Sequence, residues 1–408
     1  MPTATDMTTF GADLKEFYTL PPRRALNDKS FLHDKLTKEQ GVVDYTGKFI
    51  PFPVTMRRSM GDGSRGDAGD LPDAVAEVDV QAQILMYHHY HTLEWSEVVE
   101  LSSRNSAGAF EKVVTKKMKN LAIDMAKGIN RQLYNDSYGA LGILTDATAN
   151  ATHSVRETKY IYPGRKVDIV NATTGVPVTS GTNREVLSVD RVNKTITLDV
   201  SVTTTGSGNE AVVITGNFDL EIEGLRAITA AGRTLHGISD VTYEEWASNQ
   251  LDATGGVISE SLVEQLDDAI GERGRGDADL HLTTRGIRRR IADDMASQRR
   301  YLTEKSTDLK LGYSLVEINK VETVIDDDAP TGYFFGAKRD VLKIYKLGEP
   351  GFIESEAGTG AKVELKNGST AGRKKAVFQA FYRYHVSLGC EDPGVTGVIV
   401  NGEDSSRR

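Results

Sequence analysis

One segment of this 408-residue chain limits its possible folds more than any other, because its apolar residues recur mostly at steps of four. That spacing places side chains along one side of an α-helix, within an arc of about 100° for the first six of them. The apolar positions are Phe110, Val114, Met118, Leu121, Met125, Ile129 and Leu133. The opposite side is predicted to be basic and carries Lys112, Lys116, Lys119, Lys127 and Arg131.

The ends of this helix are also marked in the sequence. Asn105 or Ser106 can cap its first turn, and Gly139 follows Ser137-Tyr138 as a stop signal. We therefore predict one amphipathic helix over residues 105–137, about 32 residues and about 48 Å long. Helices in globular proteins average about 11–12 residues, so this helix is exceptionally long.

Composition places the chain among ordinary globular proteins and excludes several classes. Hydrophobic residues make up 39%, enough for a sizeable core and too many for wholesale disorder, and the length suggests two or three domains. The formal net charge of −9 disfavours sequence-specific binding to nucleic acid. The single cysteine, Cys390, excludes an internal disulfide and is expected to be a core thiol. Neither a signal peptide nor an apolar run near the ~18 residues of a membrane span is present, so we expect a cytosolic chain with no membrane partner.

Two extended segments precede the helix. Residues 1–45 are polar with scattered aromatic side chains, and we expect an arm that lies on another surface, such as a neighbouring subunit. Residues 46–95 predict a long hairpin, because Pro51 and Pro53 forbid a helix and residues 60–73 are rich in Gly and Asp. The return limb alternates, with one face formed by Val78, Val80, Ala82, Ile84 and Met86. A hairpin alone is marginal in water, so we expect it to lie against a partner chain.

After the helix the pattern changes twice. Short alternating strands between turn clusters predict a small all-β module over residues 155–217. Mixed α/β patterning follows, with one helix opened by a capping box at Ser261 and Glu264 and another over about residues 285–300. Residues 374–388 predict a long strand, and the tail ends polar. The predicted fold class is α+β.

Residues that could carry chemistry are few. In the run His88-His89-Tyr90-His91, the side chains of His89 and His91 would share one face of a strand and could suit a metal. No third ligand stands at a familiar spacing, so we favour polar strand residues at a subunit contact, which mild acid could affect.

Other motifs have plain structural interpretations. Arg65-Gly66-Asp67 and Arg275-Gly276-Asp277 match the cell-adhesion tripeptide, but both stand in predicted turns. A basic cluster on the helix after residue 285 is expected to pair with acidic side chains of the same or a neighbouring subunit. Its members are Arg285, Arg288, Arg289, Arg290, Arg299 and Arg300, and the acidic candidates are Glu260, Glu264, Asp267 and Asp268. Because phosphate-loop, nucleophile-elbow, zinc-protease and dinucleotide motifs are absent, we predict no catalytic, cofactor or metal site and no enzyme activity.

The order of these parts resembles the major capsid protein of tailed bacteriophages, which has the Hong Kong 97-like fold. The passage from Leu93-Glu94-Trp95 through Leu133-Tyr134 is similar to the entry and body of that fold's spine helix. Further similar stretches are residues 220–225, 329–336 and 378–388. The resemblance covers essentially the whole chain and depends on pattern and order rather than on one motif.

The resemblance implies a division of the chain and a role for it. The implied parts are an N-terminal arm (1–45), an extended loop (46–95), a peripheral domain with the spine helix (96–154), a β-rich insertion domain (155–217), an axial domain (218–375), and peripheral return strands with the C-terminal tail (376–408). Copies would self-assemble into hexamers and pentamers of an icosahedral head that encloses double-stranded DNA. Assembly would take place in the host cytoplasm, through a procapsid that matures into the virion.

The resemblance also bears on partners. Only about 100 residues precede the spine helix, so we expect either a separate scaffolding protein or a chain that is already processed, and Met1 favours the separate scaffolding protein. A portal and, as an option, a decoration protein are further expected partners. Some relatives crosslink covalently through a loop lysine, but residues 60–73 contain none and Lys48 lies near the base, so we expect no such crosslink. Contact with packaged DNA is expected to be non-specific and weak.

Three alternatives stay open at this stage. The first is an encapsulin-type bacterial compartment that loads an enzyme cargo, which neighbouring genes would distinguish from a phage head. The second is a secreted Arg-Gly-Asp adhesive or binding module, which would need an export signal. The third is a hydrolase with an unrecognised site, which would show a deep pocket with perturbed titratable groups.

Overall fold

The computed structural model describes most of the chain, with gaps. The described residues are 30–39, 42–44, 47, 49–67, 69–102, 113–206, 208–273, 275–299, 316–319, 321–354, 364–367 and 374–404. Most of the predicted arm, the first part of the predicted long helix, Lys48 and Arg300 lie outside this set. The helices are α2 (Phe31–Glu39), α3 (Glu97–Ser102), α4 (Val113–Tyr134), α5 (Leu225–Thr229), α6 (Glu260–Glu272) and α7 (Arg285–Arg299), with short 3₁₀ turns η2 (Glu244–Trp246), η3 (Arg339–Val341) and η4 (Pro393–Val395).

Three six-stranded sheets and two two-stranded sheets are formed by the strands that the structure describes. The first large sheet contains β1 (Val42–Asp44), β18 (Leu342–Lys346), β21 (Lys374–Cys390), β19 (Gly351–Phe352), β20 (Glu364–Asn367) and β4 (Tyr87–Ser96). The second contains β5 (Ala140–Ile143), β10 (Glu210–Ile214), β7 (Lys166–Asn171), β8 (Arg184–Asp190), β9 (Thr195–Thr203) and β6 (Ala149–Ser154). The third contains β13 (Asn249–Asp252), β22 (Thr396–Val400), β17 (Phe334–Ala337), β14 (Leu280–Thr283), β16 (Val321–Ile325) and β15 (Val316–Ile318). The small sheets are β2 (Phe49–Arg57) with β3 (Val78–Leu85), and β11 (Thr234–Leu235) with β12 (Ile238–Ser239).

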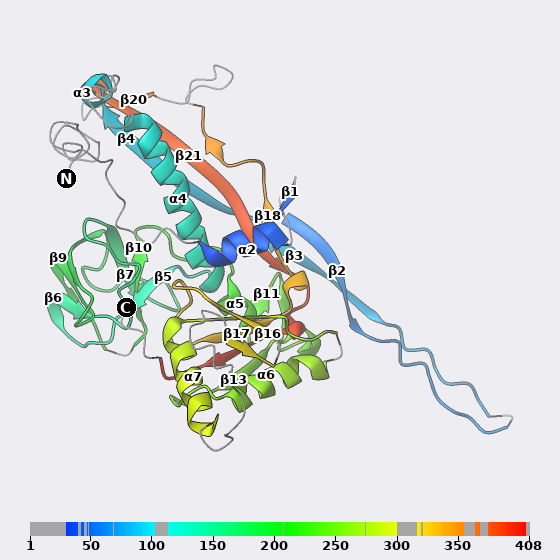
Figure 1. Ribbon diagram of the computed structural model, residues 1–408. Coiled ribbons are helices and arrows are strands. Elements are labelled where there is room, and N and C mark those ends of the chain that lie inside the picture. Colours follow the sequence, from blue (N-terminus) through cyan, green and yellow to red (C-terminus); the bar gives the residue numbers. More distant parts are fainter. Residues whose placement is uncertain are drawn as a thin grey trace, which may run out of the picture.

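A long antiparallel ribbon of β4 and β21 supports helix α4. The two strands pair over ten residue positions, from Val377 opposite Ser96 to Val386 opposite Tyr87. One face of the ribbon packs against α4 (Figure 1) through the buried side chains of Leu93, Trp95, Leu121 and Ala380. The predicted long strand is therefore present and extends to Cys390.

Helix α4 carries the predicted amphipathic pattern over its described part. Leu121, Met125, Ile129 and Leu133 are all buried. The helix ends at Tyr134 rather than near residue 137, because Asn135 turns out of it and its side-chain amide donates to the carbonyl of Ala140 at 3.0 Å. The 22 described helical residues span about 33 Å. Residues 105–112, and with them the predicted start and full length, lie outside the described part.

The third sheet corrects the assignment of the C-terminal segment. Strand β22 lies between β13 and β17, in parallel register with the first and antiparallel register with the second. Residues 376–408 therefore do not all return beside α4, because β21 joins the first sheet and β22 the third. Helix α6 packs against β13 and β22, but its cap is Ser259, whose hydroxyl accepts from the amide of Leu262 at 3.2 Å. Ser261 lies inside the first turn, so the predicted capping box was placed two residues too late.

The all-β module begins earlier than predicted. Its sheet includes β5 and β6, so it starts at Ala140 rather than at residue 155. Antiparallel pairing of β5 with β10 at Ala211 opposite Ile143 brings the two ends of the module together next to α4. The module has its own apolar core, made of Leu141, Leu144, Val155, Ile161, Val167, Ile169, Val186, Ile196, Leu198, Val202 and Val212.

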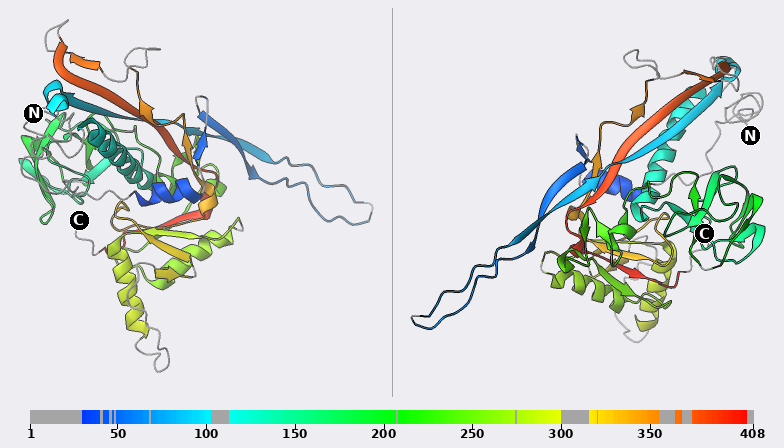
Figure 2. Two further views of the ribbon diagram at one scale, coloured as in Figure 1. Left: turned by 45° about the horizontal axis from the view of Figure 1, so that its top comes forward. Right: turned by 180° about the vertical axis from the view of Figure 1, so that it is seen from behind.

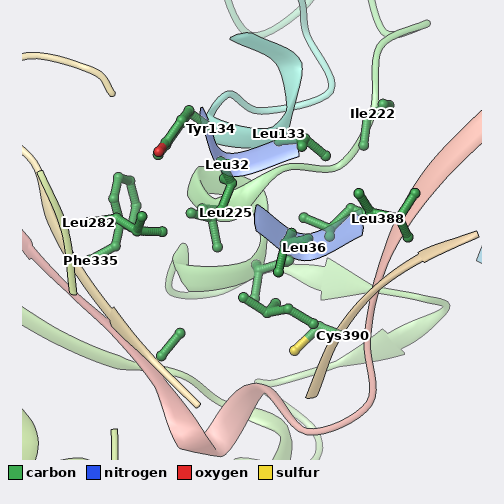
Figure 3. Packing of buried hydrophobic residues seen from close by; sticks show 14 of the residues in the cluster. Leu32, Leu36, Leu133, Tyr134, Ile222, Leu225, Leu282, Phe335, Leu388 and Cys390 are labelled. Atoms are coloured by element: carbon green, nitrogen blue, oxygen red, sulfur yellow. The ribbon is translucent and has the colours of Figure 1, made fainter. Parts of the chain in front are cut away.

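The largest core joins elements from the whole chain (Figure 3). Two leucines of α2, Leu32 and Leu36, are fully buried among residues of α4, α5, β14, β17, β18, β21 and β22. Strand β1 continues this contact by pairing in parallel with β18. The part of the predicted arm that the structure describes therefore packs on its own body, which corrects the expectation that residues 1–45 as a whole lie on another surface. The reason is that Leu32 and Leu36, one helical turn apart, form an apolar face.

Candidate assembly surface and its anchorage

A long hairpin leaves the body of the molecule (Figures 1 and 2). Strands β2 and β3 pair from Phe49 opposite Leu85 to Arg57 opposite Val78, with a bulge near the outer end. Beyond them, residues 58–67 and 69–77 continue outward, and the amide of Met60 donates to the carbonyl of Val75 at 3.1 Å. The predicted alternation is present, since Ala82 and Ile84 are buried while Asp79 and Gln81 are exposed.

The root of the hairpin is fixed to its own chain. Met56 and Ala82 are buried against Ile238 and Trp246, and further apolar contacts come from Phe52, Val54, Val80 and Tyr243. The amide of Gln83 also donates to the carbonyl of His236 at 2.8 Å, which ties β3 to the turn between β11 and β12. These contacts set the direction in which the hairpin projects.

The tip of the hairpin exposes apolar side chains far from the core. Leu71 is 86% exposed and Met60 is 57% exposed. Exposed apolar surface costs about 25 cal/mol per Å² relative to burial, so burying these side chains against another surface would stabilise the tip. Arg65 of the Arg65-Gly66-Asp67 run turns back on its own loop, where its Nε donates to the carbonyl of Asp70 at 2.9 Å.

A buried polar junction holds α2 in place. The amide of Leu32 donates to Oδ2 of Asp326 at 3.3 Å, and the amide of His33 donates to Oδ1 of Asn130 at 3.0 Å. Both amides belong to the first turn of α2, whose positive dipole end faces the Asp326 carboxylate. Oδ2 of Asp326 also accepts from the Asn130 amide at 3.0 Å and from the hydroxyl of Tyr134 at 3.1 Å. Residues of α4 and of the loop after β16 therefore cap α2 across the fold.

Asp328 connects the same junction to the β-module. Its Oδ2 lies 2.6 Å from Nζ of Lys127, and its backbone carbonyl accepts from the hydroxyl of Tyr160 at 2.6 Å. Burial and the nearby carboxylate of Asp326 raise the pKa of Asp328 above its ordinary value, while the ammonium of Lys127 acts in the opposite direction. Nζ of Lys159 adds a bond to the carbonyl of Ala329 at 2.6 Å. The loop of three consecutive aspartates thus meets α2, α4 and the β-module.

Part of the basic side of α4 is ion-paired within the subunit, which corrects the sequence prediction. Lys127 pairs with Asp328, and Arg131 is buried in an ion pair with Glu221. Glu221 also accepts from the side-chain amide of Asn217 at 2.6 Å. A helix-wheel argument assigns these cations to solvent, whereas the loop after β16 and the segment after β10 supply the carboxylates that cover them.

The chain returning from the β-module passes very close to the end of α4. A Cβ on Gly224 would lie 2.3 Å from the carbonyl oxygen of Gln132 and 2.5 Å from that of Asn135. Such distances are sterically forbidden, so only glycine permits this contact. Gly139, where the chain leaves α4 and enters the β-module, has φ of +76°, in the left-handed region that favours glycine.

The histidine run is arranged differently from the arrangement considered in the sequence. His88 pairs directly with His385 on β21, and their Nδ1 atoms lie 2.9 Å apart. Alternation along β4 places His89 on the other face. Burial, the charge of Arg131 and the neighbouring imidazoles of His88 and His385 lower the pKa of His89 from 6.5 to about 4. Nothing in the sequence pattern around His88 indicated His385 as its partner.

The remaining candidate residues form contacts within the fold. Arg285 pairs with Asp327 at 2.6 Å and Arg290 with Glu403, so these two arginines do not use the acidic residues predicted for them. Arg275 of the second Arg-Gly-Asp run pairs with Asp392 at 3.2 Å. Cys390 is fully buried, and burial raises the pKa of its thiol to about 12, as expected of a core cysteine.

A surface cavity of about 480 Å³ lies between the end of α4, α5 and β22. Both arginines that line it are ion-paired, Arg226 with Asp136 at 3.4 Å and Arg233 with Asp240 at 3.2 Å. The residues that line it include no histidine or cysteine. Among the described residues, no group of three His, Cys, Asp or Glu side chains could hold a metal ion, and no helix is long and apolar enough to cross a membrane.

These features together define a capsid-type shell fold of the Hong Kong 97-like class: a projecting hairpin, a long helix on a two-stranded ribbon, and the third sheet with helix α6 packed on it. The capsid asymmetric unit of cyanophage A-1(L) has this fold, with a TM-score of 0.54, 16% identity, and coverage of 89% of this chain and 90% of that chain. Other similar structures are the holo-SrpI encapsulin complex from Synechococcus elongatus PCC 7942 (TM-score 0.48, 10% identity, 99% and 97% coverage) and Mycobacterium phage Bobi (TM-score 0.47, 9% identity, 97% and 98% coverage).

No protein-family model and no curated protein sequence matches the chain. The predicted resemblance to tailed-phage capsid proteins is therefore confirmed by the fold, at an identity where sequence comparison finds nothing. The α+β fold class is confirmed in the same way.

Proposed function

We propose that this chain is the major capsid protein of a tailed bacteriophage and that it has a structural rather than an enzymatic role. Copies assemble into hexamers and pentamers of an icosahedral shell that encloses double-stranded DNA. The observation that carries this proposal is the hairpin, whose root is packed around Trp246 while its tip exposes Met60 and Leu71 to solvent. A monomer gains nothing from such a tip, whereas a neighbouring copy can bury it.

We assign the parts of the chain to the parts of a capsid subunit. The hairpin within residues 46–95 is the extended loop that reaches a neighbouring copy. Helix α4 with β4 and β21 forms the peripheral domain, and the third sheet with α6 and α7 forms the axial domain. The β-module, from Ala140 to Ile214, is an insertion that faces away from the hairpin (Figure 2) and is available for contacts within or between capsomers.

We further propose that the shell holds its DNA without strong affinity. The chain has a formal net charge of −9, and two of the cations on α4, Lys127 and Arg131, already pair within the subunit. Weak, non-specific contact lets DNA move while a motor packages it. A separate scaffolding protein, a portal and a decoration protein are the remaining proposed partners, with assembly in the host cytoplasm and the virion as the final location.

Shortening the hairpin tests the proposal. Because Met60 and Val75 face each other, residues 61–74 can be replaced by an Asn-Gly turn that closes the hairpin early. The full chain is expressed with and without its neighbouring genes, and particles are examined by sedimentation and electron microscopy. We expect closed shells from the unaltered chain and only free subunits or capsomers from the shortened chain, with the same circular dichroism.

The matched control removes exposed apolar surface elsewhere. Val192 and Leu187 of the β-module are exposed, and their replacement by Ser leaves the hairpin untouched. This control is expected to assemble normally. The proposal is wrong if the shortened chain assembles as well as the unaltered one, or if the unaltered chain stays monomeric at high concentration beside its neighbouring gene products. Particles that contain an enzyme cargo instead of DNA would identify a bacterial compartment.

A further inference from the structure

The open face of the β4–β21 ribbon carries a pair of histidines that the fold brings together from opposite ends of the chain. His88 and His385 are direct cross-strand neighbours, 297 residues apart in sequence. Their Nδ1 atoms lie 2.9 Å apart and their rings meet edge to face with centroids 4.6 Å apart. His88 is exposed and His385 is partly exposed, so the pair can be reached from solvent.

The separation of the two nitrogens suits a shared metal ion. At a metal–nitrogen distance of roughly 2.0–2.1 Å, two donors 2.9 Å apart subtend an angle of about 90° at the metal. That is the angle between neighbouring ligands in square-planar and octahedral complexes, which Ni²⁺ and Cu²⁺ favour. The strands hold both side chains in register, so little conformational entropy is lost on binding.

We propose that His88 and His385 form a two-histidine site for a divalent transition-metal ion of the imidazole-binding class, with water in the remaining positions. In the empty site, two nitrogens this close share one hydrogen, so one imidazole donates and the other accepts. Metal binding needs the Nδ1 lone pair of both rings, so the donor ring moves its proton to Nε2 and no net proton is released.

Groups near the two histidines both favour and oppose metal binding. Burial, His88 and Arg383 lower the pKa of His385, which favours the neutral imidazole that binds metal. Arg383 lies two residues away on the same strand face, and its charge repels a bound cation. Tyr90, on that face of β4, contacts the His385 ring at a centroid distance of 5.9 Å. Removing the charge of Arg383 therefore strengthens metal binding.

The proposed metal site is independent of the proposed assembly. It is therefore tested on the full-length chain in solution, without a histidine tag. Isothermal titration with NiCl₂ at pH 7.5 is expected to give one site per chain. His88→Ala and His385→Ala are each expected to weaken binding at least tenfold, because a chelate becomes a single ligand. Arg383→Gln is expected to tighten binding about threefold.

The control is His91→Ala, which removes an exposed histidine of the same strand on the opposite face and is expected to change Ni²⁺ affinity less than twofold. Circular dichroism confirms folding, and His88→Gln provides a second variant that keeps a polar side chain. The proposal is overturned if no site titrates with NiCl₂, if His91→Ala weakens binding as much as His88→Ala, or if His385→Ala leaves the affinity unchanged.

Discussion

Removing the Asp326 carboxylate should release helix α2 from the body of the subunit. Asp326→Ala takes the acceptor from the backbone amides of Leu32 and Asp328, from one bond of the Asn130 amide and from the Tyr134 hydroxyl. The lost helix cap costs about 1 kcal/mol, and the buried tyrosine hydroxyl left without a partner costs about 1–3 kcal/mol. Asn130 keeps its bond to Asp328, and relief of the repulsion between Asp326 and Asp328 offsets part of the loss. We expect a net destabilisation of α2 of about 2 kcal/mol.

Hydrogen exchange is the appropriate assay because a chain with several cores need not unfold in one step. A loss of about 2 kcal/mol makes opening roughly thirtyfold more frequent, so the amides of residues 31–39 should exchange roughly thirtyfold faster. Strands of the β-module away from the junction should exchange at unchanged rates. If Asp326→Ala does not fold, Asp326→Asn keeps one acceptor oxygen and should give a smaller effect on the same amides.

The neighbouring aspartate is the matched control. Asp327 forms an exposed pair with Arg285, and pairs of this kind contribute about 0–1 kcal/mol. Asp327→Ala should therefore change exchange in α2 by a fewfold at most. Equal exchange in Asp326→Ala and Asp327→Ala would refute the claim that Asp326 caps α2.

Three further outcomes follow from the geometry. Gly224→Ala should destabilise the contact with the end of α4 by about 3 kcal/mol or more, through steric overlap with the Gln132 carbonyl, seen as loss of soluble protein or as faster exchange in the last turn of α4. Arg131→Met should cost about 3–5 kcal/mol because it leaves Glu221 buried without its cation, and an accompanying Glu221→Gln should recover part of that loss in thermal unfolding. His89 has a folded pKa of about 4, below its ordinary 6.5, so the unfolded chain binds its proton first as the pH falls. The stability due to neutral His89 is therefore complete above pH 6.5 and lost toward pH 4, and His89→Gln should make the urea midpoint less dependent on pH in that window.

The sequence predicted those features that depend on the pattern of one helix or one strand alone. The apolar face of α4, with Leu121, Ile129 and Leu133, follows from helical periodicity alone, and all three side chains are buried. The alternation of the hairpin limb and the length of β21 were equally readable, because a half-buried strand repeats every two residues. Periodicity does not fix where a sheet closes, so the first strand of the β-module, at Ala140, was assigned to the wrong part.

Contacts between distant segments could not be predicted from pattern. Lys127 and Arg131 look like solvent-exposed cations on a helix wheel, yet their carboxylate partners come from residues 328 and 221. His88 meets His385 only because the register of β4 and β21 places them opposite each other. This register is set by the pairing of two strands whose histidines are 297 residues apart in the chain. The local sequence pattern of either strand does not determine which residues pair.

The distribution of these contacts bears on how the proposed shell would form. The polar junction around Asp326 and the contact at Gly224 join α2, α4 and the β-module inside one chain, so these parts are placed before any neighbour arrives. The root of the hairpin is placed too, since Trp246 and Met56 are buried with it. The exposed tip, with Leu71, is left as the part whose apolar surface is unsatisfied in the single chain. A preformed subunit with a directed hairpin loses little conformational entropy on docking, so a modest apolar contact per neighbour, repeated around a closed shell, is enough to drive assembly.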